Sequence, residues 1–255
     1  MTLAAFDLTG KRALVTGSGQ GIGLALATAL AEAGSAVVLN GRDAAKLDRA
    51  AAALRAAGHA VDIAAFDVTD HPAIGEAVAR VERDIGPLDI LVNNAGIQRR
   101  MPLQDFPVAT WHEIVRANLD SVFFVGQAVA RCMIPRGHGK IINIVSVQSE
   151  LGRQTIAPYT ATKGAVKMLT KGMCADWARF GIQCNGIGPG YFATELNQAL
   201  VDDAAFSDWL RQRTPAGRWG SVEELGGTAV FLASAASDFI NGQMIYVDGG
   251  LTAVV

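Results

Sequence analysis

A tyrosine and a lysine stand four residues apart near the middle of the sequence, in the stretch YTATK at 159–163. On a helix, residues four apart lie on one face, so the phenol of Tyr159 and the ammonium of Lys163 would be neighbours. A nearby cation lowers the pKa of a phenol, which can then exchange a proton near neutral pH. The pair therefore predicts an acid/base site; the alternative is a solvated lysine beside a half-buried tyrosine.

A glycine-rich turn, TGSGQGIG at 16–23, follows the apolar run 12–16 and opens an apolar helix. Glycines allow a tight turn and a close approach of the backbone, while the free N–H groups and the dipole of the helix attract a pyrophosphate. A preceding strand and a following helix are the context that such a turn requires. We therefore expect a dinucleotide to bind here, at Gly17, Ser18, Gly21, Ile22 and Gly23.

The second apolar run, 36–40, ends in Asn40, and Arg42 follows two residues later. In dinucleotide-binding folds, an acidic residue at this point accepts hydrogen bonds from the adenosine ribose. A guanidinium in its place favours a 2′-phosphate, which predicts NADP as cofactor, with NAD used less efficiently. Arg42 could also be an ordinary exposed cation at the start of a helix, and Gln20 does not provide a second cation.

Short apolar runs alternate with alanine-rich stretches of helical character along the whole chain. The runs are 12–16, 36–40, 60–65, 90–93, 140–145, 182–187 and 244–247, and the helical stretches are 24–33, 44–57, 73–84, 109–133, 158–180 and 222–234. This alternation predicts parallel strands joined by helices on both faces of the sheet. The fold class is α/β, with a single doubly wound domain over 1–255.

The segment 191–220 interrupts the alternation, because it is much longer than a turn and carries several aromatic residues. Such an insertion after a strand favours a flap over a ligand, with an inert surface excursion as the alternative.

Composition limits the partners of the chain. Its 255 residues include 22 basic and 24 acidic side chains, a balance that disfavours nucleic acid and favours a small molecule. Three scattered cysteines and four dispersed histidines show no metal-ligand spacing and suggest a reducing compartment. No apolar run is long enough to cross a membrane, so we expect a cytoplasmic protein with no metal and no membrane partner.

Several of these features occur together in the order and spacing of one family. They are TGSGQGIG at 16–23, Asp67-Val68, NNAG at 93–96, Asn118, Ser146, Tyr159 with Lys163, and Pro189-Gly190. In this combination the chain resembles the short-chain dehydrogenase/reductase family over essentially its whole length. The resemblance implies a Rossmann-type fold with a seven-stranded sheet and a catalytic set of Asn118, Ser146, Tyr159 and Lys163.

The resemblance also implies roles for these residues. Tyr159 would donate or accept the proton, Ser146 would bind the substrate oxygen, Lys163 would hold the nicotinamide ribose, and Asn118 would support a water-linked proton relay. Further cofactor contacts would come from Asp67, Val68, Asn93, Asn94, Gly96, Pro189, Gly190 and Thr194. Taken singly, Ser146 could cap a turn, Asn118 could bond to backbone, and Asp67 could cap a helix.

Three segments flank the expected pocket: 96–106, 146–153 and 190–195. They resemble the subgroup of this family that interconverts D-gluconate and 5-keto-D-gluconate. Arg99 and Arg100 follow the strand 90–93, and a guanidinium can clamp a carboxylate with two parallel hydrogen bonds. Gln148, Glu150 and Arg153 offer polar groups to hydroxyls. We expect a sugar acid to bind at Arg99, Arg100, Ser146, Gln148, Glu150 and Tyr159, although either of the first two arginines could form a surface ion pair.

Other functions remain open at this stage. The chain could reduce another sugar acid or a 3-ketoacyl carbonyl, and an enzyme of the latter kind would need a basic docking patch. It could also be a non-catalytic dinucleotide-binding sensor or subunit. By family resemblance we expect a homotetramer formed through the helices 109–133 and 158–180 and the apolar C-terminal segment, since closed assemblies bury such surfaces.

Overall fold

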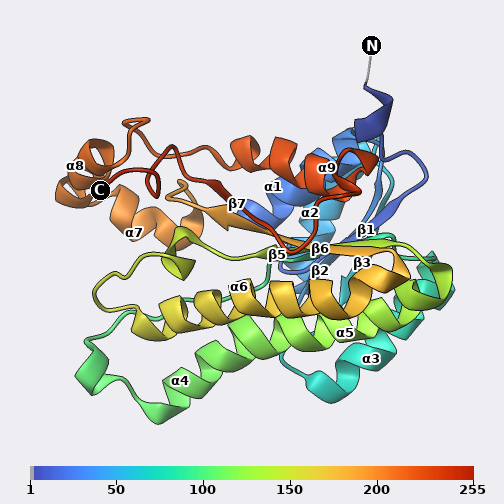
Figure 1. Ribbon diagram of the computed structural model, residues 1–255, viewed down its shortest axis with the longest axis horizontal. Coiled ribbons are helices and arrows are strands. Elements are labelled where there is room, and N and C mark those ends of the chain that lie inside the picture. Colours follow the sequence, from blue (N-terminus) through green and yellow to red (C-terminus); the bar gives the residue numbers. More distant parts are fainter. Residues whose placement is uncertain (1–2) are drawn as a thin grey trace.

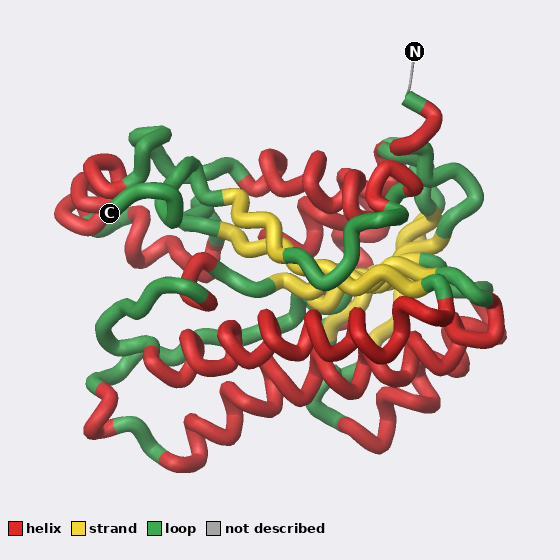
Figure 2. The backbone as a smooth tube through the Cα atoms, viewed as in Figure 1, coloured by secondary structure: helices red, strands yellow, loops and turns green. Residues whose placement is uncertain are grey.

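A parallel sheet of seven strands runs through the computed structural model, which describes residues 3–255 apart from the side chain of Leu196 (Figures 1 and 2). The strand order is β3-β2-β1-β4-β5-β6-β7. The strands are β1 (Arg12–Val15), β2 (Ala36–Gly41), β3 (Val61–Ala65), β4 (Ile90–Asn93), β5 (Gly139–Ile144), β6 (Ile182–Pro189) and β7 (Met244–Val247). The predicted doubly wound, Rossmann-type sheet is therefore confirmed, with each strand within a few residues of its expected position.

Helices cover both faces of the sheet (Figure 1). One face carries α1 (Gly21–Glu32), α2 (Ala44–Ala56) and α9 (Gly226–Ala233). The other carries α3 (His71–Arg80), α5 (Ser121–Met133) and α6 (Ala157–Trp177), while α4 (Val108–Val115) precedes α5. The sheet is thus the middle of three layers, and its strands have apolar neighbours on both sides.

The apolar runs of the strands fill two separate cores, because successive side chains point to opposite faces. In β1, Ala13 and Val15 pack into the core beneath α1, α2 and α9, whereas Leu14 packs into the core beneath α3, α5 and α6. In β4, Leu91 likewise points away from Ile90 and Val92. This alternation holds the strands in register, and the carboxyl ends of the strands meet at one edge.

The predicted helix 109–133 is interrupted by a π turn at Arg116–Asp120, between α4 and α5. A second π turn, Val81–Ile85, follows α3. Such turns widen the hydrogen-bond ladder and often lie near functional sites. The first of them includes Asn118, which belongs to the predicted catalytic set.

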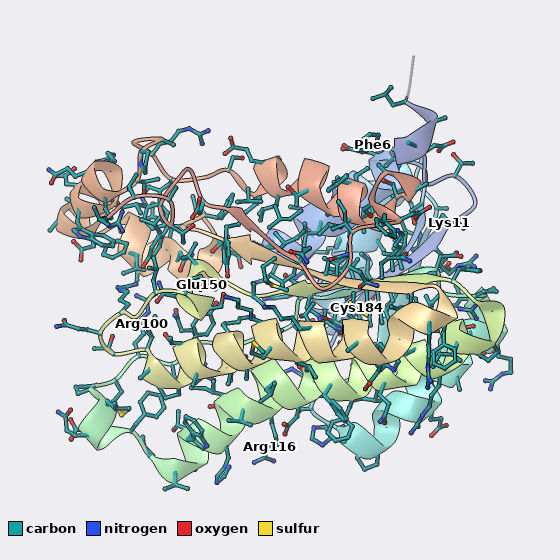
Figure 3. The ribbon with its side chains drawn as sticks, in the orientation of Figure 1. Phe6, Lys11, Arg100, Arg116, Glu150 and Cys184 are labelled. Carbon is teal, nitrogen blue, oxygen red and sulfur yellow. The ribbon has the colours of Figure 1, made fainter. Side chains whose placement is uncertain are left out.

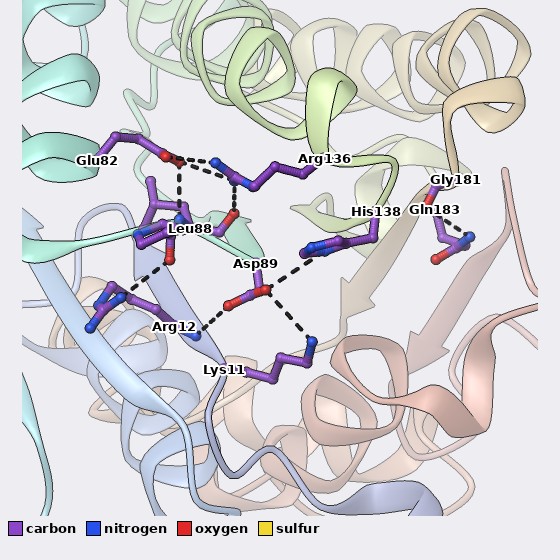
Figure 4. Close-up of polar contacts among 10 residues, drawn as sticks. Lys11, Arg12, Glu82, Leu88, Asp89, Arg136, His138, Gly181 and Gln183 are labelled. Atoms are coloured by element: carbon purple, nitrogen blue, oxygen red, sulfur yellow. Dashed lines mark hydrogen bonds and ion pairs between the residues drawn. The ribbon is translucent and has the colours of Figure 1, made fainter.

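Charged side chains fix the opposite, amino-terminal edge of the sheet (Figure 4). Arg136 Nη1 lies 2.7 Å from Glu82 Oε2, and its Nη2 donates to Leu88 O at 2.6 Å. The backbone N–H of Arg12 donates to Asp89 Oδ2 at 3.0 Å. These contacts join the start of β1, β4 and β5, so the charged network is remote from the carboxyl edge.

The segment 191–220 contains two helices, α7 (Gln198–Val201) and α8 (Ala204–Arg213), and a β-bridge between Phe192 and Gly220 closes it. Four of its aromatic rings form one cluster: Tyr191, Phe206, Trp209 and Trp219. We call residues 191–220 the flap segment, and its role as a flap stays a prediction. Within residues 3–255, the structure contains no helix both long and apolar enough to span a bilayer.

Two glycines at the amino-terminal edge of the sheet differ in the space around them. Gly137 and Gly181 end the turns after α5 and α6, both with φ of 73°, a left-handed conformation that favours glycine. A Cβ on Gly181 would lie 2.1 Å from Gly137 O, whereas a Cβ on Gly137 would meet nothing within 4 Å.

Gly137→Ala should cost about 1–2 kcal/mol of unfolding free energy, from backbone conformation alone. Gly181→Ala should cost about 1–3 kcal/mol more, because its methyl group also overlaps a carbonyl. Urea denaturation of both variants measures the difference. Equal losses would show that the overlap is relieved without cost.

Candidate active site

A cavity of about 630 Å³ lies at the carboxyl edge of the sheet. It is where ligands of open α/β sheets bind. Most of the predicted site residues line it: Gly17, Gly21, Ile22, Gly23, Asn40, Arg42, Asp67, Val68, Asn94, Gly96, Arg99, Arg100, Ser146, Gln148, Tyr159, Lys163, Pro189, Gly190 and Thr194. Ser18, Asn93, Asn118 and Glu150 lie outside the described lining.

The glycine-rich turn forms a cradle at the start of α1. Gly17 has a φ of 65°, and a Cβ on Gly23 would lie 2.4 Å from both Gly17 O and Asn94 Nδ2. Asn94 Nδ2 donates to Thr16 O at 2.9 Å, which ties the turn to the end of β4. Glycine is therefore needed at Gly23, and the N-terminus of α1 is left facing the cavity.

Ser18 supports this turn from beneath. Its hydroxyl donates to Val15 O at 2.7 Å and accepts from the N–H of Asn40 at 3.0 Å. These contacts join β1 to β2, and Ser18 is fully buried. In the structure its hydroxyl contacts the protein, and any contact with a cofactor would come through its backbone.

At the end of β2, Asn40 turns its amide into the sheet. Its Nδ2 donates to Ala64 O at 2.9 Å and Phe66 O at 3.1 Å, while its buried Oδ1 has no partner within the described residues. Arg42 Nη1 lies 3.7 Å from Asp67 Oδ2, and both side chains remain partly exposed. Such a surface pair contributes little to stability, so Arg42 can exchange this contact for another anion.

One cation near this end was not identified from the sequence. Lys46 Nζ, in the first turn of α2, donates to Gln20 Oε1. Gln20 lines the cavity beside the glycine cradle. Residue 20 is uncharged, and the second cation comes instead from a lysine 26 positions further along the chain. The sequence feature that could have identified this cation is a lysine in the first turn of the helix that follows β2.

Tyr159 and Lys163 lie on one face of α6, as their spacing predicts. Lys163 Nζ is 5.7 Å from the centre of the Tyr159 ring and donates to Ile144 O at 2.7 Å. Burial lowers the pKa of Lys163 from 10.5 to about 8. Burial also raises the pKa of Tyr159, and its contact with Ser146 offsets this only in part. In this cavity the pKa of Tyr159 is therefore raised, and desolvation is the largest cause.

Ser146 and Asn118 each make contacts that the sequence left as alternatives. Ser146 Oγ accepts from the N–H of Gln148 at 3.2 Å, so it caps a turn, yet it also lines the cavity. Asn118 Oδ1 accepts from the N–H of Ile97 at 2.7 Å, and its Nδ2 donates to Ile97 O at 2.9 Å. The Asn118 amide thus bonds to backbone and holds the loop after β4 against the π turn.

The polar residues at the far end of the cavity separate into two groups. Arg99 Nη2 lies 2.6 Å from Glu113 Oε1, so its charge is already paired. Glu150 is also engaged elsewhere: it forms an ion pair with Lys167 and accepts from Tyr246 at 2.5 Å. These contacts hold the pKa of Glu150 below its usual range and keep its carboxylate away from the cavity.

Arg100 and Gln148 remain available at this end. Arg100 Nη2 donates only to Gln98 Oε1, at 3.1 Å, and Figure 3 shows Arg100 in the region between α6 and the flap segment. Gln148 Oε1 is buried with no partner among the described residues, while its Nε2 lies 3.5 Å from the Tyr191 hydroxyl. The cavity therefore joins a glycine cradle, the half-buried Tyr159 beside the buried Lys163, and a polar, cationic end.

Comparison with known proteins agrees with this geometry. A family model described as enoyl-(acyl carrier protein) reductase, one of the short-chain dehydrogenases/reductases, matches residues 17–252. The chain therefore belongs to the short-chain dehydrogenase/reductase family and is an oxidoreductase.

Several of the proteins similar to this chain belong to one subgroup of the family. The chain is 62% identical to a gluconate 5-dehydrogenase of Gluconobacter oxydans over 247 residues, covering 97% of this chain and 96% of that protein. It is 54% identical to a 5-keto-D-gluconate 5-reductase of Escherichia coli, covering 98% of each. A crystal structure of a gluconate 5-dehydrogenase from Burkholderia cenocepacia, in complex with NADP and tartrate, superposes with a TM-score of 0.97 at 66% identity, covering 99% of each chain.

Burial of Lys163 predicts a pH-dependent effect on stability. Its native pKa lies below the unfolded value, so between about pH 8 and 10.5 the unfolded chain binds the proton and the native chain does not. The stability contributed by this site therefore rises with pH through that window, and below pH 8 the burial penalty is fully present. That penalty is about 3 kcal/mol, at 1.36 kcal/mol for each pKa unit.

Lys163→Met should therefore be more stable than the parent below pH 8, by up to about 3 kcal/mol. This advantage should shrink as pH rises toward 10.5. Urea denaturation of both proteins across this range, without cofactor, measures it. A stability difference that stays constant with pH would contradict the shifted pKa.

Proposed function

We propose that the protein interconverts D-gluconate and 5-keto-D-gluconate, with NADP as hydride carrier. The observation that carries this proposal is that a glycine cradle, the Tyr159–Lys163 pair and Arg100, which has no ion-pair partner within residues 3–255, line one cavity. The names of its relatives support the same reaction and cofactor. In the direction of oxidation, gluconate loses a hydride and a proton at C5, and a ketone forms.

The residues of the cavity fit a phosphorylated dinucleotide. Gly17 and Gly23 leave room for a pyrophosphate at the start of α1, and the unpartnered Asn40 Oδ1 offers an acceptor at the end of β2. Arg42 and Lys46 place two cations near the position of a 2′-phosphate. Asp67, Val68, Asn94, Gly96, Pro189, Gly190 and Thr194 would complete the cofactor site. NADP, when bound, accepts the hydride from C5 or returns it.

Tyr159 would take the C5 hydroxyl proton during oxidation and return it during reduction. It takes this proton as a phenolate and returns it as a phenol, and the charge of Lys163 stabilises the phenolate from a buried position where water screens it poorly. Ser146 donates to the substrate oxygen as charge develops on it. Asn118 would act indirectly, because its amide holds the Ile97 backbone, and a proton relay through the π turn stays a prediction.

The other expected functions fit the cavity less well. A pocket for an acyl chain should be lined mainly by apolar side chains, whereas this one ends in Arg100, Gln148 and Arg153. A non-catalytic sensor would have no use for a buried lysine beside a tyrosine and a serine. We therefore retain the sugar-acid reaction.

We also propose that the whole chain works as one catalytic domain in the cytoplasm and assembles into a homotetramer. The exposed apolar side chains Trp111, Phe123 and Met168 on α4, α5 and α6 support the assembly, since burying them would remove apolar surface from water.

The test of the proposed reaction is a spectrophotometric assay for NADPH with D-gluconate or 5-keto-D-gluconate. The parent should turn over both substrates. Tyr159→Phe should bind NADPH with unchanged affinity, because the ring remains, yet lose turnover by about 100-fold or more without its acid/base group. NADPH fluorescence measures the binding. No turnover by the parent would overturn the proposal, and an active Tyr159→Phe would overturn the role of the phenol.

Arg42 should set the cofactor preference. Arg42→Ala should raise KM for NADP by about 10- to 100-fold, the range expected for charge-assisted hydrogen bonds to phosphate. KM for NAD should change little, since NAD has no 2′-phosphate. Arg83→Ala is a matched control, because Arg83 pairs with Asp84 in the π turn after α3. Equal effects on the two cofactors would contradict phosphate recognition by Arg42.

A further inference from the structure

Arg153 stands between the cavity and the flap segment. Its guanidinium carbon lies 4.5 Å from the centre of the Phe206 ring and 6.0 Å from that of Tyr191. Cation–π contacts of this kind restrain the planar guanidinium without neutralising it. Arg153 lines the cavity, and within residues 3–255 no carboxylate pairs with it. Its charge is therefore held in place without a counter-ion.

Arg100 faces the same end of the cavity. Burial lowers the pKa of Arg100, and the positive charge of Arg153 lowers it further. The two guanidiniums thus repel each other across a partly desolvated space, an arrangement that an anion between them would relieve. Neighbouring Arg99 differs, because Glu113 already neutralises it.

The loops that carry these two arginines are tied together. The N–H of Met101 donates to Thr155 O at 3.0 Å, next to Arg100 on one side and two residues from Arg153 on the other. Thr155 has a φ of 69°, a left-handed conformation that is unfavourable for a β-branched residue. Strain of this kind persists where surrounding contacts impose it and is common at ligand clamps. The spacing of the two arginines is thereby fixed by backbone.

We propose that Arg153 is a specificity-determining residue that binds the substrate carboxylate together with Arg100, and that Phe206 of the flap segment positions its guanidinium. This inference rests on the proposed function and adds to it the residue that separates acids from neutral polyols. A carboxylate between the arginines accepts charge-assisted hydrogen bonds from both and removes their repulsion. A neutral hydroxyl at the same place does neither.

The test compares D-gluconate with D-glucitol, which carries a CH₂OH group in place of the carboxylate. Arg153→Met keeps the length and apolar body of the side chain but removes its charge. KM for D-gluconate should rise by about 10- to 100-fold, while kcat for D-gluconate and kcat/KM for D-glucitol should change little. The preference for the acid over the polyol should therefore fall by the same factor.

Arg211→Met is the matched control, because Arg211 lies on α8 in the same flap segment but pairs with Asp208 at 2.6 Å and does not line the cavity. Its acid/polyol preference should match that of the parent. Phe206→Leu should raise KM for D-gluconate by a smaller factor, because the charge remains but is less well positioned. The KM of Arg153→Lys for D-gluconate should lie between those of the parent and Arg153→Met, because the lysine keeps the charge but lacks the planar guanidinium.

The outcomes separate this inference from the proposed function. Turnover of D-gluconate by the parent, with an unchanged acid/polyol preference in Arg153→Met, would overturn the role of Arg153 alone. An equal loss with both substrates would do the same, because it would indicate damage to the flap. If the parent does not oxidise D-gluconate, fluorescence of Trp209 and Trp219 measures D-gluconate binding directly. Equal affinities of the parent and Arg153→Met would then overturn the role of Arg153 as well.

Discussion

A buried ammonium is the constraint on which the site depends. Lys163 is buried on α6 and donates to the carbonyl of Ile144 at the end of β5. A charge in this place is costly, as the pKa of about 8 shows. The hydrogen bond orients the ammonium toward the end of β5, where Ser146 follows. The sheet and α6 thereby bring Tyr159, Lys163 and Ser146 to one wall of the cavity.

The same desolvation makes the cavity sensitive to the charge of a bound ligand. Burial disfavours a charged lysine and a charged phenolate alike, so each shifts toward its neutral form. At the far end, Arg100 and Arg153 repel each other. Each of these costs falls when a group of the appropriate charge enters the cavity. In the proposed mechanism, binding and proton transfer are therefore linked through electrostatics in a poorly screened space.

The sequence was sufficient for the fold and for the composition of the cavity. Continuous apolar runs identify buried parallel strands, and glycine spacing identifies the cradle, because both depend on local chemistry. The contact partners of long polar side chains were not predictable from the sequence. Glu150 turns to Lys167 and Tyr246, and Arg99 turns to Glu113, because of partners 14 to 96 residues away.

Burial was the other property hidden from the sequence. The spacing of Tyr159 and Lys163 correctly placed them together on α6, but it could not show that the Lys163 ammonium is buried. The predicted lowering of the Tyr159 pKa relies on Lys163 together with a nicotinamide ring, and desolvation opposes it. The contacts of Asn118 were also not predictable. Its amide bonds to the backbone of Ile97 because a π turn positions it, and no sequence pattern predicted that turn.

The most direct measurement is the titration of Tyr159 with and without oxidised NADP. The chain has three tyrosines, so replacing Tyr191 and Tyr246 with phenylalanine leaves Tyr159 alone, and NMR of tyrosine labelled at Cζ follows its ionisation. Without cofactor we expect Tyr159 to ionise above the usual pKa of a phenol, because it is buried. With oxidised NADP bound we expect ionisation at lower pH, since a second positive charge then lies beside Lys163. A titration that does not change when NADP binds would contradict the proposed acid/base site.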